Sequence, residues 1–407
     1  MPSLSAGFDR PSRVANRPVL ENGFRLFFLA AAVWLPASLV IWLLLLLRGL
    51  PWTPALDGLA WHQHAALFGG IGAVMAGFLL TAVPSWTGRP ALRGAGLLAL
   101  FLLWLPGRLF GLFGGGAAAL LALLADAAFF GTLAAFASRE ILASGNRRNL
   151  PVALLLGLFA AGCVLARLEP FLGPTVGGFG RHLGLAVVMM LLALIGGRVT
   201  PAFTRNWLLQ RGRRPLPAEW GVWDKLTLLF WAATLLVWLA FPFGATGILF
   251  LVSGALHLLR LARWRTAATL AEPLVFVLHL GYAWLGIGGL LYGAALLGYG
   301  LPPSTAFHAF TAGAFGTMTL AVMTRASLGH TGRPLTADRT TSTIYLMVTA
   351  GAVLRLLASL WGENALLGTG VPALLWGGAY ILFALGFGPI LLRPRLTPVN
   401  SREDVER

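Results

Sequence analysis

Three apolar stretches of this chain each begin with a histidine, a side chain that binds metals through its imidazole. His64, His182 and His308 open these stretches, and each stretch runs toward basic residues at its far end. An ionisable side chain in a membrane-length apolar segment is costly, so it indicates a functional site by default. These histidines predict a metal or haem site inside a membrane bundle. Taken singly, each could instead be an interfacial residue hydrogen-bonded to water.

The first and third stretches are internal repeats. Residues 64–90 align with residues 308–334 without gaps and share nine identities over 27 positions, including His64/His308 and Gly72/Gly316. Equivalent positions in the repeat imply equal depth, so we expect His64 and His308 to be the two axial ligands of one haem. The chain has no cysteine pair for covalent attachment, which predicts haem b.

The composition is that of a membrane protein. Hydrophobic residues form 57% of the 407 residues and charged residues 11%, with a mean hydropathy of +0.79; soluble domains carry about 25% charged residues. A helix needs roughly 20 apolar residues to cross a bilayer, and only helices or closed barrels satisfy their backbone there. We predict an all-α integral membrane protein with twelve transmembrane helices at residues 24–47, 62–84, 94–113, 117–137, 151–168, 182–200, 226–241, 245–261, 273–297, 305–324, 342–361 and 371–392.

The basic residues follow membrane topology rather than a nucleic-acid site. The net charge is +16, but 25 of the 30 Lys and Arg residues lie in the termini or in alternate loops. The positive-inside rule therefore places both termini in the cytoplasm. Residues 1–23 are then a basic tail, residues 24–392 the membrane domain and residues 393–407 a second tail. The expected partner of this charge is the lipid bilayer, and no nucleic acid is implied.

This orientation brings the histidines to the outer ends of the second, sixth and tenth helices. A spacing of four helices predicts three four-helix units in a pseudo-threefold arrangement. Arg108, Arg167 and Arg355 lie in the outer halves of their helices, where a charge needs a partner or water. Glu169 could pair with one of them, haem propionates could bind the others in bidentate fashion, or the side chains could snorkel to the surface.

His62 and His64 cannot both ligate one ion from a regular helix. Residues two apart point about 200° away from each other. Either one of them is structural, or the helix stands between two sites and serves both. In the second case, which we expect, His64 faces the haem and His62 faces a second metal site toward His182. If the helix began only after His62, an extended end could instead bring both histidines to one metal.

Other polar residues of the predicted helices are further candidates. His279 could be an inner ligand, a proton-relay group or a packed polar residue, and His257 is a similar candidate near the inner end of its helix. Asp126 is the lone acid at mid-membrane, where it could be protonated and hydrogen-bonded. Cys163 is the only cysteine, which excludes a disulfide framework and predicts no thiolate metal cluster.

Several motifs resemble the NnrS family of haem- and copper-containing bacterial inner-membrane proteins associated with the response to nitric oxide. They are WHQHAALFG, AGFLLTAVPSWTGRP, VLHLGYAWL and FTAGAFGTMTLAVMTRASLGHTGRPL, and the resemblance runs from about residue 23 to residue 392. The WHxH motif of the family falls on Trp61, His62 and His64, and its HLGY motif begins at His279. The family has a glutamate after the second histidine of WHxH, whereas this chain has Ala65. Any role of that carboxylate must be absent or moved.

The resemblance implies haem and copper as cofactors, a bacterial inner-membrane location, and a role in nitric oxide metabolism or nitrosative-stress tolerance. Copper would be bound by His62 and His182, since imidazole suits it, and the haem by His64 and His308, with Arg108, Arg167 and Arg355 at its propionates. The helix plan also resembles haem–copper oxidases, so an oxidoreductase that acts on nitric oxide and uses an unidentified electron donor is one expectation. Binding without turnover is another. The alternative class is a transporter or exporter with a parallel repeat and no haem.

Overall fold

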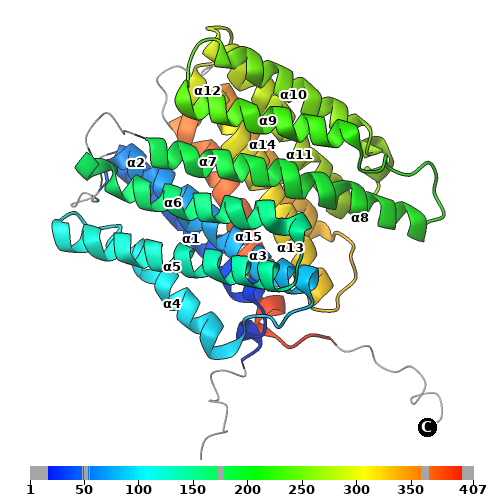
Figure 1. The fold of residues 1–407 in the computed structure, drawn as a ribbon, viewed down its shortest axis with the longest axis horizontal. Coiled ribbons are helices and arrows are strands. Elements are labelled where there is room, and N and C mark those ends of the chain that lie inside the picture. Colours follow the sequence, from blue (N-terminus) through cyan, green and yellow to red (C-terminus); the bar gives the residue numbers. More distant parts are fainter. Residues whose placement is uncertain are drawn as a thin grey trace, which may run out of the picture.

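The computed structural model describes residues 17–47, 49, 54, 56–172, 178–358 and 366–396, which fold into helices joined by short connections (Figure 1). Within these residues, nine helices are long and apolar enough to cross a membrane. They are Gly23–Leu46, Gly58–Thr87, Gly116–Ala143, Arg147–Glu169, Phe179–Gln210, Val222–Ala240, Pro273–Leu296, Pro303–His330 and Gly368–Leu392. Gly94–Phe110 and Thr246–Ala262 are shorter apolar helices. The chain is therefore an all-helical protein with the character of a membrane protein.

A helix lies within each of the twelve predicted ranges, of which residues 359–361 lie outside the described residues. The number of crossings and the pseudo-threefold arrangement remain predictions. In chain order the helices are α1 (Gly23–Leu46), α2 (Gly58–His64), η2 (Ala65–Ile71), α3 (Gly72–Thr87), α4 (Gly94–Phe110), α5 (Gly116–Ala143), α6 (Leu150–Leu172), α7 (Phe179–Leu191), η5 (Leu192–Gly196), α8 (Gly197–Gln210), α9 (Val222–Ala240), α10 (Thr246–Ala262), α11 (Pro273–Leu296), α12 (Pro303–Ala306), η7 (Ala309–Phe315), α13 (Gly316–His330), α14 (Arg339–Leu356), η9 (Leu366–Gly370) and α15 (Val371–Leu392). Single-turn 3₁₀ helices lie at Pro18–Leu20, Arg147–Asn149 and Thr266–Thr269.

Helix α2 begins before His62, at Gly58. Asp57 caps this end, because its Oδ1 accepts a hydrogen bond from the backbone N–H of Ala60 at 2.9 Å. His62 and His64 are therefore both helical. The alternative in which an extended chain carries both to one metal is wrong.

Four π-helical segments lie in the described residues: η2 follows α2, η5 follows α7, η7 follows α12 and η9 precedes α15. A π turn shifts the hydrogen-bond register, and such turns occur frequently at functional sites. Indole N–H groups of neighbouring helices bond carbonyls of η2 and η7: Trp34 donates to Ala65 at 2.8 Å, Trp104 to Gly69 at 3.1 Å and Trp376 to Ala312 at 3.0 Å. Since η2 begins one residue after His64 and η7 one residue after His308, the two repeats share this local geometry.

Helix ends that lie next to basic segments contact one another. Figure 1 shows the N-terminal end of α1, in blue, beside the C-terminal end of α15, in red. Two polar contacts join such ends: Arg25 donates to the carbonyl of Leu391 at 2.9 Å, and Arg89 pairs with Glu140. In addition Arg198, inside the long helix Phe179–Gln210, donates to Asn149 Oδ1 at 3.1 Å. Basic segments far apart in sequence thus lie at shared ends of neighbouring helices.

Candidate metal centre

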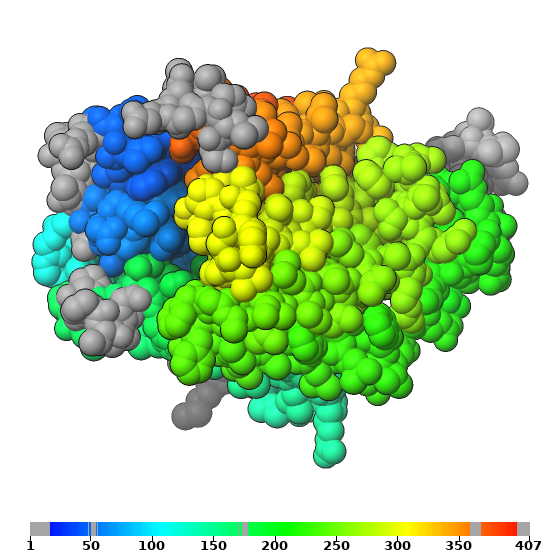
Figure 2. Space-filling view, turned by 90° about the horizontal axis from the view of Figure 1, so that it is seen from above, coloured from blue at the N-terminus to red at the C-terminus, as the bar shows by residue number. Residues whose placement is uncertain are grey.

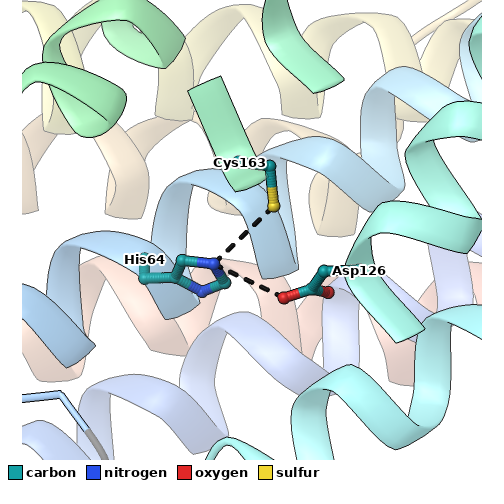
Figure 3. A group of neighbouring side chains, drawn as sticks. All are labelled: His64, Asp126 and Cys163. Atoms are coloured by element: carbon teal, nitrogen blue, oxygen red, sulfur yellow. Dashed lines mark hydrogen bonds and ion pairs between the residues drawn. The ribbon is translucent and has the colours of Figure 1, made fainter. Parts of the chain in front are cut away.

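Three potential metal ligands from three helices converge in the interior of the bundle. His64 ends α2, Asp126 lies on α5 and Cys163 lies on α6. Figure 3 shows one ring nitrogen of His64 pointing toward both partners. His64 Nε2 lies 3.7 Å from Cys163 Sγ and 3.4 Å from Asp126 Oδ2, and the three ligand atoms all lie within 4.8 Å of one another. This geometry places three donors around one point.

Aromatic rings pack beneath this cluster and exclude water from it. The ring centroids of His64 and Phe68 are 5.1 Å apart, those of Phe68 and Phe159 are 4.9 Å apart, and those of Phe130 and Phe159 are 5.2 Å apart. The three phenylalanines are fully buried, and His64 is only 2% exposed. Electrostatic interactions between the groups of the cluster are therefore stronger than they would be in water.

Two arginines hold the carboxylate of Asp126. Arg108 Nη2 pairs with Asp126 Oδ1, and Arg167 Nε donates to Oδ2 at 2.9 Å. Arg167 Nη2 also donates to the carbonyl of Gly107 at 2.9 Å, and Arg108 Nη1 lies 3.5 Å from the carbonyl oxygen of Phe68. A buried charge is tolerated when it is paired and hydrogen-bonded in this way. Haem propionates were expected to pair with Arg108, Arg167 and Arg355. The first two of these arginines instead pair with Asp126.

Glu169 pairs with an arginine other than Arg108, Arg167 and Arg355. It pairs with Arg181, one of the first residues of α7, and accepts a hydrogen bond from the backbone N–H of Gly180 at 3.1 Å. The suggested pairing of Glu169 with Arg108 or Arg167 is therefore wrong, because both arginines pair with Asp126. Among the described residues Glu169 makes no contact with Arg355 either.

His308 lies in a second group, with His62 and Arg355. His62 and Arg355 are within electrostatic range of His308, and Figure 2 shows the yellow segment that contains α12 next to the blue N-terminal helices. The Nδ1–H of His308 donates to the carbonyl of Ser304 at 2.7 Å, which leaves Nε2 with its lone pair. His62 stacks on Trp42 with ring centroids 4.8 Å apart, and its buried Nδ1 has no hydrogen-bond partner among the described residues.

The structure therefore groups the histidines differently from the expected haem pair. His64 contacts Asp126 and Cys163, whereas the charged and titratable neighbours of His308 are Arg355 and His62. His62 and His64 do face different surroundings, as expected for residues two apart on a helix.

The remaining histidines have their own partners. The Nδ1–H of His182 donates to the carbonyl of Gly178 at 2.8 Å, and its ring packs edge-on against Trp238, so its described contacts do not lead to His62. His279 uses both ring nitrogens, one with Thr204 Oγ1 at 2.7 Å and the other with Thr266 Oγ1 at 3.0 Å. This is the arrangement of a packed polar residue. His257 Nδ1 lies 2.9 Å from the hydroxyl of Tyr282.

Cys163 is the member of the site that sequence reasoning missed. A single cysteine in an apolar helix was taken to exclude a thiolate cluster, but one thiol beside an imidazole and a carboxylate is also a possible ligand set. Cys163 lies four residues before Arg167, so both side chains are on one face of α6. That spacing was the available signal, because Arg167 was already a candidate.

Comparison with models of protein families identifies the family of this chain. A family model described as NnrS protein matches residues 18–395, which include every histidine, Asp126, Cys163 and the arginines of both groups. Comparison with curated proteins finds no match. Because the match spans nearly all of the 407 residues, the chain belongs to the NnrS family.

Proposed function

We propose that this protein binds haem and copper in the bacterial inner membrane and acts in the response to nitric oxide or in nitrosative-stress tolerance. The buried convergence of His64, Asp126 and Cys163 carries the proposal. Imidazole and thiolate are donors that suit copper, and the aromatic packing gives the dry surroundings of a metal site. Membership of the NnrS family and the apolar helices support the same assignment.

For the haem we propose His308 as an axial ligand. The Nδ1–H of His308 is fixed by the carbonyl of Ser304, a bond that commonly orients a ligating imidazole, and Nε2 is left to bind iron. The neighbours of His308 favour His62 over His64 as the second axial ligand, since the buried Nδ1 of His62 has no partner among the described residues. Arg355 would bind a propionate. Bound haem and copper would supply sites at which nitric oxide coordinates and exchanges electrons.

Nitric oxide is small and neutral, so apolar space inside the bundle can hold it. A cavity of about 90 Å³ lies between three π-bearing helices and is lined by Ile71, Leu192, Ile195, Met318 and other residues, nearly all of them apolar. We also propose that both termini and the basic loops are cytoplasmic, which is supported by the contacts that bring together the helix ends beside these basic segments.

The test is the visible spectrum and metal content of the full-length protein purified from bacterial membranes. We expect a Soret band with sharp α and β bands after reduction, together with copper. His308→Ala should lose the bands, whereas His330→Ala, which removes an exposed imidazole, should keep them. A wild-type protein with neither haem nor copper would contradict the proposal and favour a transporter.

A further inference from the structure

An apolar groove lies on the outer side of the bundle between α9 and α10, which run side by side at one edge of the molecule (Figure 1). Leu226 and Leu229 in this groove are each more than half exposed, so it opens away from the core of the bundle. Its volume is about 370 Å³, and it is lined by Trp223, Leu226, Thr227, Leu229, Phe230 and Leu256.

The groove lies at the end of these helices where the neighbouring segments are strongly basic. Residues 205–225 and 260–265 contain eight Arg and Lys residues but only two acidic residues. The two segments meet, because the backbone N–H of Ala218 donates to the carbonyl of Arg263 at 3.0 Å. Within the part of the chain that the structure describes, five of the basic residues are exposed and pair with no acid: Arg211, Arg213, Arg214, Lys225 and Arg265. Such an excess of positive charge at the end of membrane helices attracts anionic lipids.

Two basic side chains share a helix face with residues of the groove. Lys225 precedes Leu229 by four residues on α9, and Arg263 follows Leu256 by seven residues at the end of α10. Residues four or seven apart lie on one face of a helix. The apolar groove therefore has a cationic group from each side at the same end.

Arg263 has donors left for a further anion. Asp224 Oδ1 is bound by the fully buried Arg260 at 2.7 Å, whereas Arg263 Nη1 approaches Oδ2 only to 3.4 Å and its side chain is 33% exposed. Guanidinium groups carry five N–H donors and bind phosphate oxygens in bidentate fashion. Arg260 thus compensates the charge of Asp224 inside the bundle, and Arg263 can contact a phosphate outside it.

We propose that the groove between α9 and α10 binds an anionic phospholipid. One acyl chain lies against Leu226, Leu229 and Leu256, and the phosphate pairs with Lys225 and Arg263. Trp223, at the basic end of the groove, has the amphipathic ring that is enriched where hydrocarbon meets headgroups. The inference goes beyond the proposed function, because it requires neither haem nor copper.

The experiment measures lipid binding by native mass spectrometry on the full-length protein in detergent, after bound lipid has been removed. The probes are phosphatidylglycerol, phosphatidylcholine with the same acyl chains, and glycerol phosphate as a headgroup without chains. We expect the wild type to prefer phosphatidylglycerol to both. The double variant Lys225→Gln/Arg263→Gln should bind it about 30-fold more weakly, since each basic side chain near a membrane contributes a factor of about five.

Two matched controls separate the groove from the rest of the surface. Arg211→Gln/Arg213→Gln removes the same charge from exposed arginines that lie over Trp207, and it should weaken binding much less. Leu229→Trp places an indole in the groove and should weaken binding. Leu236→Trp makes the same change at a leucine of α9 that is equally exposed, 68% against 67%, but lies outside the groove, and it should bind as the wild type does.

Several outcomes would overturn the inference. Equal binding of the two lipids would mean that charge does not select the occupant, and equal loss in the two double variants would mean that the whole basic surface attracts lipid without a site. If glycerol phosphate competed as well as phosphatidylglycerol, the site would be one for free phosphate. If the double variant at Lys225 and Arg263 does not fold, Lys225→Gln decides alone by its expected five-fold loss, since it breaks no ion pair among the described residues.

Discussion

Two buried carboxylates in this protein are each held by two arginines, yet their surroundings differ in the chemistry that they allow. Asp126 pairs with Arg108 and Arg167, and Asp224 pairs with Arg260 and Arg263. The remaining side of Asp126 faces an imidazole and a thiol. Asp224 instead accepts the backbone N–H of Gly221 at 3.0 Å, at the start of α9. The same ionic pairing therefore serves a candidate ligand site in one place and a helix junction in the other.

The junction around Asp224 is organised by Arg260. Its guanidinium group donates to Asp224 Oδ1 at 2.7 Å, to the hydroxyl of Tyr282 at 2.7 Å and to the carbonyl of Ala193, in the π turn η5, at 3.0 Å. Arg108 similarly approaches the carbonyl of Phe68 in η2. Arginine thus supports a π turn in both regions. Among the described residues, only the Asp126 region brings three potential metal ligands together.

The largest expected effect is that of Asp126→Asn. It leaves Arg108 and Arg167 buried without a counter-charge, which costs about 3–5 kcal/mol of stability, and it removes a proposed copper ligand. Asp224→Asn is the matched change. It should destabilise less, because the side chain of Arg263 is 33% exposed and water screens it, and it should leave copper bound. Unfolding in detergent and copper content after purification measure both effects.

The comparison between the two regions depends on this pair of variants. Loss of copper from Asp224→Asn, or full copper and wild-type stability in Asp126→Asn, would mean that the two carboxylates do not have the different roles assigned to them.

A smaller loss of stability is expected from Arg260→Lys. The ammonium group keeps the charge but cannot reproduce the planar set of bonds to Asp224, Tyr282 and Ala193. Losing charge-assisted hydrogen bonds should lower stability by about 2–3 kcal/mol, with haem and copper retained. Arg108→Lys should instead lower the copper content, because the carboxylate of Asp126 loses the planar guanidinium group that orients it. If Arg260→Lys lost copper as well, the Asp224 region would not be purely structural.

The sequence predicted the helices and most residues of the candidate site, but not which of these residues contact one another. Apolar length alone locates the helices, since lipid forces the backbone to bond within each one. The π turns were not predicted, because the apolar pattern continues through Ala65–Ile71 and Ala309–Phe315 unchanged. Repeat symmetry implied equal depth for His64 and His308, but depth does not fix the direction in which each helix turns its side chain.

The grouping around Asp126 shows the same limit. Arg108, Arg167 and Asp126 were each recognised as costly charges within a membrane, and the cost itself predicts that they find partners. Which partners they find depends on the rotation of α4, α5 and α6 against one another. That rotation is set by packing, through close approaches such as Gly107 beside Asp126, and single-sequence patterns do not encode it.

The smallest expected effect concerns a carboxylate outside the membrane-spanning helices, and it tests whether burial explains the size of the Asp126 effect. Asp338 is exposed and caps α14, with its Oδ1 accepting the backbone N–H of Thr341 at 2.7 Å. Asp338→Ala should cost about 1 kcal/mol, whereas Asp338→Asn, which keeps a capping oxygen, should cost a few tenths. A loss as large as that of Asp126→Asn would show that burial is not the cause of the difference.

The pH dependence of the Asp338 contribution has a definite sign. Hydrogen bonds from Thr341 hold the pKa of Asp338 below its usual value of 3.8. Because the folded pKa lies below the unfolded one, the contribution of the charged cap is complete above about pH 4–5, and it is lost as pH falls through the folded pKa. The difference in melting temperature between the wild type and Asp338→Asn should therefore be constant near neutral pH and shrink below 3.8. A difference that grew on acidification would mean that the carboxylate stabilises α14 in its protonated form, and the comparison with Asp126, which pairs with two arginines, would fail.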